Sequence, residues 1–214
     1  MRIKNARVTP SFDLESVEIE LGGGPVCGID EAGRGPWAGP VVAAAVILDP
    51  DAIPPGIEDS KAMDEERREI VYQRIIAHAR VGIGTADVVR IDRDNILNAT
   101  LWAMGEAVSQ LAPAPALALI DGNRAPRLGC AVRTIVKGDA KCLSIAAASI
   151  VAKVTRDRMM TALAEAHPGY GFERHKGYGT PEHAAALQRL GASPVHRRSF
   201  KPVQLALGLG AEGG

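Results

Sequence analysis

Cysteine, aromatic residues and long apolar runs are all scarce in this chain of 214 residues. Its three cysteines, Cys27, Cys130 and Cys142, form no CxxC pair, so we expect reduced thiols rather than a disulfide or a zinc site. Aromatic residues make up 4% of the chain, which leaves Ala, Val, Ile and Leu to build the core. The longest apolar run, Val41 to Leu48, is too short to cross a bilayer. Because the first residues also lack the apolar segment of a signal peptide, we expect a cytoplasmic protein that does not enter a membrane.

Net charge is absent as well, because 25 basic residues balance 25 acidic ones. The two signs are unevenly distributed along the chain. Residues 1–123 carry 11 Lys and Arg against 19 Asp and Glu, whereas residues 124–201 carry 14 against 5. A basic second half is typical of a surface that contacts phosphates, and an acidic first half can supply metal ligands. The alternative is a chance asymmetry that disappears on folding, because the halves of a sequence need not be the halves of a structure.

The apolar periodicity and the turn residues predict an α/β domain with a central sheet flanked by helices. We expect a leading arm at 1–25, one domain at 26–208 and a flexible tail at 209–214. Within the arm, the alternation of Ser16 to Leu21 predicts an edge strand. The expected core strands are 25–29, 41–48, 80–86, 116–120 and 131–136, and the expected helices are 64–79, 91–111, 144–166 and 181–190.

Acidic residues follow three of the expected strands. Asp30 and Glu31 come after the first, Asp121 after the fourth, and Asp139 after the run that ends at Gly138. An unpaired carboxylate at the end of a buried strand is costly, so a group of them calls for a cation. Ligands that are all oxygen suit Mg²⁺ or Mn²⁺ better than zinc. The alternative for each acid, taken alone, is an ordinary turn, since Asp next to Gly is common in turns.

The adjacent pair Asp30 and Glu31 adds a geometric condition. Neighbouring side chains on a regular strand point to opposite faces of the sheet. Both carboxylates therefore reach one metal cluster only if the strand ends at this point and the chain bends. The following segment, Gly33-Arg34-Gly35-Pro36, supplies such a bend, and its glycines let backbone N–H groups approach a phosphate or a sugar hydroxyl. A turn with a surface acid pair is the alternative.

Several motifs together resemble those of bacterial ribonuclease HII. The first is Gly28-Ile-Asp-Glu-Ala-Gly-Arg-Gly-Pro36, and the others follow in the order of that family: Asp59-Ser-Lys61, Ile120-Asp-Gly-Asn123, Val136-Lys-Gly-Asp139, Ala147-Ala-Ser-Ile-Val-Ala-Lys-Val-Thr-Arg-Asp157, His175-Lys-Gly-Tyr178 and His196-Arg-Arg-Ser-Phe200. The resemblance covers roughly residues 26–208. It implies a ribonuclease H-like fold with a central mixed sheet and a helical C-terminal part.

The resemblance also implies a site. Its metal-binding and catalytic carboxylates are Asp30, Glu31, Asp121 and Asp139, which hold a pair of Mg²⁺ or Mn²⁺ ions. The backbone of Gly33, Arg34 and Gly35 is expected to contact the ribose 2′-OH, with Tyr178 stacking on the neighbouring deoxyribose. Where relatives usually carry a second Lys, this chain has Ala62, which leaves Lys61 as the expected phosphate contact.

Other residues are interpreted from their positions in the sequence. Lys153 and Arg156, on one expected helix, are interpreted as charges that face the substrate, and Asp157 as an ion-pair partner. We expect Tyr170, Phe172 and Trp102 in the core and both His78 and His183 on the surface. Trp37 is either a loop anchor or a substrate contact.

The expected function is metal-dependent cleavage of RNA in RNA/DNA hybrids, and of duplex DNA on the 5′ side of single embedded ribonucleotides, which leaves 5′-phosphate and 3′-OH ends. We expect a monomer. One alternative is another nuclease on the same fold, although such enzymes lack the Gly-Arg-Gly element beside the first acids. The other is an inactive hybrid-binding module, which would be expected to have lost at least one of the four carboxylates.

Overall fold

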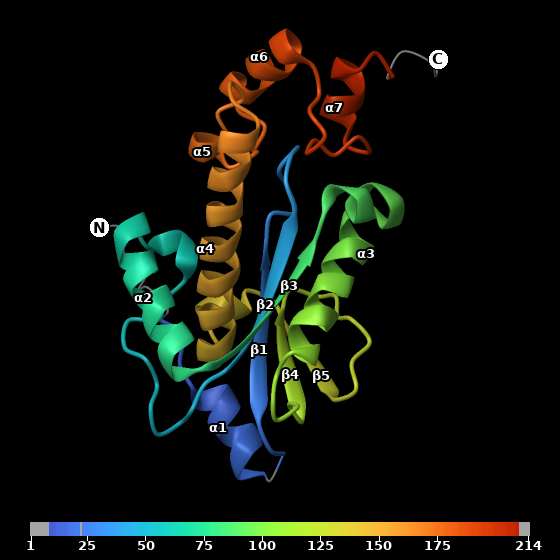
Figure 1. The fold of residues 1–214 in the computed structure, drawn as a ribbon. Helices are drawn as coiled ribbons and strands as arrows, with labels where there is room; N and C mark the ends of the chain where they lie inside the picture. Colours follow the sequence, from blue (N-terminus) through green and yellow to red (C-terminus); the bar gives the residue numbers. More distant parts are fainter. Residues whose placement is uncertain (1–8, 22, 210–214) are drawn as a thin grey trace, which may run out of the picture.

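The computed structural model describes residues 9–21 and 23–209. A five-stranded sheet lies at its centre, in the order β3-β2-β1-β4-β5 (Figure 1). The antiparallel part pairs β1 with β2 and β2 with β3, and the parallel part pairs β1 with β4 and β4 with β5. The sheet is therefore mixed, as the resemblance implied. The strands are β1 Val26–Ala32, β2 Val41–Ile47, β3 Arg80–Ala86, β4 Leu117–Asp121 and β5 Ala131–Ile135.

Helices cover both faces of the sheet. Helix α3 (Val88–Ser109) packs on one face, and α4 (Leu143–Ala166) packs on the other with α2 (Glu65–His78) beside it (Figure 1). The C-terminal part is helical, as expected, with α5 Phe172–His175, α6 Pro181–Leu190 and α7 Lys201–Ala206. Short 3₁₀ helices at Ser60–Ala62 (η1) and Gly138–Ala140 (η2) complete the described elements, together with α1 at Asp13–Glu20.

Capping residues explain where several helices begin. The side chains of Asp64, Asp87 and Thr180 each accept a hydrogen bond from the backbone N–H three residues later. Each satisfies one of the N–H groups that a helix leaves without a partner at its first turn. Helix α3 is interrupted at Asn95, whose φ of 64° lies in the left-handed region.

Successive side chains of β1 point to opposite faces of the sheet, which divides the core into two layers. Cys27 and Ile29 belong to the layer under α3, whereas the even-numbered positions face α4. At Gly28 the backbone of α4 comes so close that an added Cβ would lie 2.1 Å from the carbonyl carbon of Ser144. Alanines 146–148 are fully buried and allow this approach. Helix α4 is thereby held directly against the strand that carries the first two acids.

The edge strand predicted at 16–21 is wrong, because these residues belong to the helix α1 and the turn after it. Leu14 and Ile19 both pack on a cluster that contains Val26 and Ile145. The alternating pattern was compatible with both structures, and packing against the start of α4 favours the helix. The described part of the leading arm is therefore fixed to the domain, and residues 1–8 of that arm lie outside the described residues.

The end predicted for the first strand is also wrong. Strand β1 continues through Asp30 and Glu31 to Ala32, with Asp30 opposite Ala44 and Glu31 opposite Ala43 on β2. Pairing with β2 holds this segment extended beyond the point where the apolar run stops. Asp30 and Glu31 consequently leave opposite faces of β1, so they can share a metal cluster only past the end of β4, where no strand of that side separates the two faces.

The predictions about aromatic and histidine residues can be compared with the structure, and His78 is exposed, as expected. Tyr170 and Phe172 are buried, as expected, and stack on one another with their ring centroids 5.3 Å apart. The prediction for Trp102 is wrong, because it is 36% exposed and the guanidinium of Arg90 covers its ring. The prediction for His183 is wrong as well, because it is fully buried.

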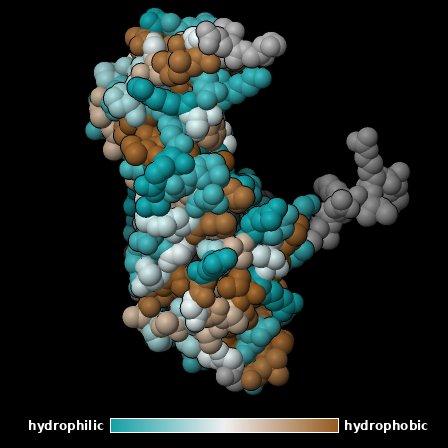
Figure 2. Space-filling model, turned by 90° about the vertical axis from the view of Figure 1, so that its right-hand side faces the viewer, coloured by the Kyte–Doolittle hydropathy of each residue, from teal (hydrophilic) through white to brown (hydrophobic). Residues whose placement is uncertain are grey.

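None of the described helices combines the length and the apolar character that crossing a membrane requires. On the face that carries α3, hydrophilic and hydrophobic residues are interspersed (Figure 2). The expected flexible tail lies outside the described residues except for Leu209.

Candidate active site

Two neighbouring parallel strands bring the first three acids together. Ile29 on β1 is paired with Ile120 on β4, so that Asp30 and Asp121 occupy the next positions along the two strands. Strand β4 ends at Asp121, while β1 runs on to Ala32. The sheet thus narrows at this point, and Glu31 borders the space beyond the end of β4.

Asp30 is the most enclosed of these carboxylates. It is 5% exposed on the α4 side of β1, and its Oδ1 accepts a hydrogen bond of 2.7 Å from the N–H of Glu31. Burial raises the pKa of Asp30 well above its ordinary value, and the charges of Glu31 and Asp121 add to this shift. The hydroxyl of Ser149 acts in the opposite direction. An ionised Asp30 therefore needs a nearby positive charge.

Glu31 leaves β1 on the opposite face, toward α3. Its Oε1 accepts a hydrogen bond of 3.1 Å from the guanidinium of Arg34. Burial raises the pKa of Glu31 above its ordinary value, and Arg34 offsets part of this shift. Together with Asp121, these residues border a small hollow of about 90 Å³ that reaches α3.

Asp139 joins the site through η2. The N–H of Gly138 donates a 2.7 Å hydrogen bond to Oδ1 of Asp121, which fixes η2 beside the end of β4. Asp139 itself is 5% exposed, and Lys61 donates to its Oδ2 over 2.8 Å. This hydrogen bond raises the pKa of Lys61. The structure therefore places Lys61, the expected phosphate contact, against one of the expected metal ligands.

The donor set suits a hard divalent cation, although its side chains are turned toward internal partners. Within the described ranges, no three His, Cys, Asp or Glu side chains form a ready-made metal site. Arg34 and Lys61 each neutralise one acid, and a backbone N–H binds Asp121. All the donors are carboxylate oxygens, the ligands that Mg²⁺ and Mn²⁺ prefer. A divalent cation that binds here would take the place of the Arg34 guanidinium beside Glu31 and of the Lys61 ammonium beside Asp139.

The loop after β1 meets the loop that carries Tyr178. An added Cβ at Gly35 would lie 3.6 Å from the Tyr178 ring, and the N–H of Trp37 donates a 2.8 Å hydrogen bond to the carbonyl of Gly177. Gly33 has a φ of 97°, a conformation that favours glycine. Tyr178 is 46% exposed, so that its ring is accessible beside the Gly33-Arg34-Gly35 segment. Trp37 packs on His183 with ring centroids 5.3 Å apart, which is the contact of a loop anchor.

The structure gives Arg156 a position different from the one expected. Its side chain is 1% exposed and donates to the carbonyl oxygens of Pro40, Ala38 and Lys176. A buried guanidinium held by backbone oxygens cannot face a substrate, so the substrate-facing interpretation of Arg156 is corrected. Lys153 forms an ion pair with Asp157, which agrees with the interpretation of Asp157.

Sequence reasoning missed two groups of buried residues that hold the loop after β1 and the loop of Tyr178 in place. One is Arg197, which is fully buried and donates to carbonyl oxygens of the loop after β1. The other is a chain of hydrogen bonds in which the Ser193 N–H donates to Nδ1 of His196, and Nε2 of His196 lies 3.0 Å from Nε2 of His183. Because Nδ1 of the neutral His196 ring accepts a hydrogen bond, its proton is on Nε2, which donates to Nε2 of His183. The proton of His183 is then on Nδ1, which donates to the Tyr178 carbonyl over 3.0 Å. The His196 motif was visible in the sequence, but nothing in it indicated burial.

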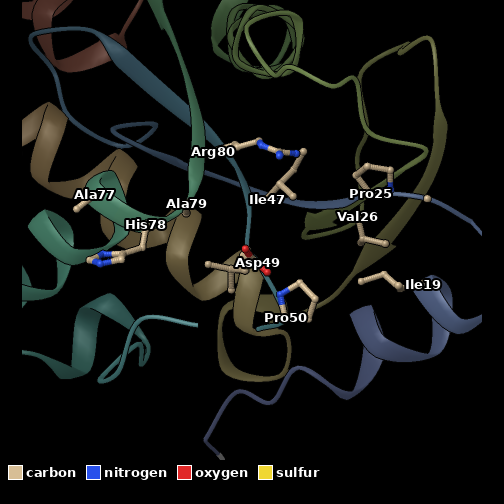
Figure 3. Close-up of a pocket in the computed structure, with 12 residues that line it drawn as sticks. Ile19, Pro25, Val26, Ile47, Asp49, Pro50, Ala77, His78, Ala79 and Arg80 are labelled. Carbon is tan, nitrogen blue, oxygen red and sulfur yellow. The ribbon is translucent and has the colours of Figure 1, made fainter. Parts of the chain in front are cut away.

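A cavity much larger than the hollow beside Glu31 lies far from the acids. Its volume is about 540 Å³, and it is lined by residues at the start of β1, the end of β2 and the end of α2, such as Val26, Ile47 and His78 (Figure 3). Because the acids are at the other end of β1, this cavity belongs to the opposite end of the sheet. Size alone therefore does not locate the candidate site.

Acids near the ends of adjacent central strands, on a mixed sheet with this strand order, are typical of hydrolases of the ribonuclease H-like class. The family model described as Ribonuclease HII matches residues 27–203. A ribonuclease HII of Parvibaculum lavamentivorans is 59% identical over 209 residues, which cover 96% of this chain and 76% of the relative. The chain belongs to the ribonuclease HII family and is a type 2 ribonuclease H.

Solved structures agree with this assignment. The fold is similar to that of ribonuclease H2 from Pyrococcus horikoshii, with a TM-score of 0.74 and 25% identity over 88% of this chain and 100% of that one. A ribonuclease HIII structure in complex with Mn²⁺ shares the fold with a TM-score of 0.68 and 21% identity, covering 91% of this chain and 73% of the other. The expected ribonuclease H-like fold is thereby confirmed.

Proposed function

We propose that this ribonuclease cuts the RNA strand of RNA/DNA hybrids and also cuts duplex DNA on the 5′ side of a single embedded ribonucleotide, leaving 5′-phosphate and 3′-OH ends. The observation that carries the proposal is the meeting of three elements at one end of the sheet. These are the four carboxylates, the Gly33-Arg34-Gly35 loop and the exposed ring of Tyr178. Residues 26–208 form the catalytic unit, which acts as a monomer in the cytoplasm.

In this proposal, Asp30, Glu31, Asp121 and Asp139 hold two Mg²⁺ or Mn²⁺ ions, which when bound activate water and stabilise the leaving oxygen. The raised pKa of Asp30 and of Glu31 supports this role, because a cation removes the cost of burying ionised carboxylates. The Mn²⁺ named with the ribonuclease HIII structure is consistent with it.

The remaining residues recognise the substrate. The backbone of Gly33, Arg34 and Gly35 contacts the 2′-OH, which distinguishes a ribonucleotide from its neighbours. Tyr178 stacks on the adjacent deoxyribose. Lys61, which a bound cation would displace from Asp139, and Lys153 contact phosphates.

The test is cleavage of a labelled DNA duplex that contains one ribonucleotide, run beside an all-DNA duplex and a long RNA/DNA hybrid. Each is incubated with Mg²⁺, Mn²⁺ or EDTA. We expect one cut 5′ of the ribonucleotide, lost in EDTA. In the Asp121→Asn variant, which loses a ligand charge while Gly138 keeps an oxygen acceptor, we expect no cut and an unchanged far-ultraviolet circular dichroism spectrum.

The outcomes separate the parts of the proposal. Cleavage of the long hybrid without cleavage at the single ribonucleotide would disprove the junction specificity only. Binding of both substrates without cleavage in either metal would support the inactive module instead. Full activity of Asp121→Asn would remove this residue from the ligand set.

A further inference from the structure

Two buried cations lie beneath the Gly33-Arg34-Gly35 loop. Arg197 is fully buried and Arg156 is 1% exposed. Within the described part of the chain, neither forms a salt bridge with a carboxylate. Backbone carbonyl oxygens surround them instead. Buried charges of this kind cost stability, so their presence calls for a function that an apolar side chain could not provide.

Arg197 binds the loop through all three of its nitrogen atoms. Its Nη2 donates to the carbonyl of Gly33 over 2.6 Å, and its Nη1 donates to the carbonyl of Arg34 over 3.0 Å. Nε donates to Gly39 over 2.9 Å, and Nη2 also reaches Pro40 over 3.1 Å. One planar group therefore fixes two consecutive peptide units of the loop.

The direction of these two bonds determines where the opposite edges of the peptide units point. Both peptide units are trans, so each N–H lies antiparallel to its carbonyl. Because the carbonyls of Gly33 and Arg34 point at Arg197, the N–H groups of Arg34 and Gly35 point away from it. Neither N–H has an acceptor among the described residues. Two neighbouring N–H groups on one side form a concavity that suits an oxygen atom with lone pairs.

Arg156 completes the support by joining this loop to the next one. It donates to the carbonyl of Pro40, to which Arg197 also donates, and to the carbonyl of Lys176, two residues before Tyr178. An added Cβ at Gly33 would lie 2.0 Å from Nε of Arg156, so the loop lies directly on this side chain. Burial of the Arg197 side chain, and the nearby charge of Arg156, lower the pKa of Arg197 to about 9.

We propose that Arg197 is a positioning residue for the ribonuclease reaction, which aims the backbone N–H groups of Arg34 and Gly35 at an oxygen of the substrate. The oxygen that fits is the 2′-hydroxyl of the ribonucleotide, a step that rests on the proposed function. Arg197 itself contacts no substrate. A lysine keeps the charge but lacks the planar fork that spans two carbonyls, so Arg197→Lys separates orientation from charge.

The experiment measures binding rather than cleavage. Affinities of the wild type, Arg197→Lys and Arg197→Ala are compared in EDTA for a duplex with one ribonucleotide and for the matching all-DNA duplex. The ratio of the two affinities reports the contribution of the 2′-OH. We expect Arg197→Lys to lower this ratio at least about fivefold, as the loss of one oriented hydrogen bond predicts. Arg198→Ala, which removes an exposed charge from the adjacent position, is expected to leave the ratio unchanged.

Controls keep the outcomes distinct. Circular dichroism and thermal unfolding establish which variants fold. If Arg197→Ala does not fold, Arg197→Lys is the decisive variant. A folded Arg197→Lys with the wild-type ratio would overturn the positioning role. A wild-type ratio close to one would instead reject recognition of the 2′-OH, and with it the proposed junction specificity. Restoration of the Arg197→Ala ratio by added guanidinium would support the role of the fork.

Discussion

Buried charged side chains lie at two places along helix α4, and the two places differ in what the charge binds. Near its start, the carboxylate of Glu15 accepts a 2.7 Å hydrogen bond from the N–H of Ser144 and a 3.1 Å bond from the thiol of Cys142. Further along, Arg156 and the neighbouring Arg197 bind carbonyl groups of loops. Among the described residues neither place has a counter-ion: a backbone N–H and a thiol bind Glu15, and backbone carbonyl groups bind the two arginines.

The difference lies in the elements that are joined. Glu15 fixes helix α1 to the first turn of α4, where N–H groups otherwise lack partners. The arginines fix loops whose outer edges border the carboxylates and Tyr178. We therefore expect changes at the first place to alter stability alone, and changes at the second place to alter recognition.

The largest effect is expected for Asp30→Asn, which tests a third kind of buried charge. Burial raises the pKa of Asp30 above its ordinary value, so this carboxyl group costs stability at pH values above its ordinary pKa, where the unfolded chain loses the proton more readily than the folded protein. The variant should unfold at a higher temperature than the wild type without metal, and its melting temperature should no longer rise with Mn²⁺. Cleavage should fall more than about a hundredfold, because even residues that only support ligands contribute 10- to 100-fold.

Glu66→Gln is the matched control, because Glu66 is exposed on α2. It should change neither the melting temperature nor the response to Mn²⁺. A lower melting temperature for Asp30→Asn would show that the ionised carboxylate stabilises the metal-free fold.

At the start of α4, Glu15→Ala should lower the free energy of unfolding by about 2 kcal/mol, since it leaves the Ser144 N–H buried without an acceptor. Glu20→Ala, on the exposed side of the same helix, should change it by less than about 0.5 kcal/mol. Urea unfolding measures both. If folded Glu15→Ala lost its preference for the ribonucleotide, the division between the two places along α4 would not hold.

A smaller effect is expected for Tyr178→Ala. We expect cleavage at the single ribonucleotide to fall roughly tenfold, the size of one lost stacking contact. Because the ring is 46% exposed, the melting temperature should change little. Tyr178→Phe keeps the ring and should keep the activity. A cooperative loss of the fold in Tyr178→Ala would identify a core residue instead.

The smallest expected effect concerns pH. Burial and the nearby His183 lower the pKa of His196 to about 4, from an ordinary value of about 6.5. The stability that the neutral ring contributes is complete above about 6.5 and is lost as the pH falls toward 4, because the unfolded chain binds the proton more readily. The melting temperature of the wild type should fall as the pH is lowered from about 6.5 to about 4. It should fall less steeply in His196→Gln and as steeply as the wild type in His78→Gln. An equal slope in all three proteins would contradict the assignment.

The sequence predicted elements whose signals are local. The strand at Arg80–Ala86, the helix that Asp64 caps and the acids near the ends of β1 and β4 were all recognisable from neighbouring residues. What remained hidden depends on distant contacts. Arg156 is buried because the loop at 33–40 and the loop before Tyr178 both fold over it, and no neighbour of Arg156 in the sequence signals this.

The same reasoning explains the errors at the ends of elements. Strand β1 extends past its apolar run because β2 supplies hydrogen-bond partners up to Ala32, opposite Val42. Helix α1 forms where alternation suggested a strand because Leu14 and Ile19 find a shared apolar surface. Trp102 is exposed because its ring packs against the guanidinium of Arg90 and not in the core between α3 and the sheet.

The close approach at Gly28 has a consequence for motion. No side chain separates β1 from α4 there, so the strand and the helix cannot slide past each other without a collision of their backbones. Asp30, two residues further on, and Ser149 on α4 therefore belong to one stiff frame. Any adjustment that admits a wide or distorted duplex has to occur at hinges in the surrounding loops, so that the substrate adapts to the acids rather than the acids to the substrate.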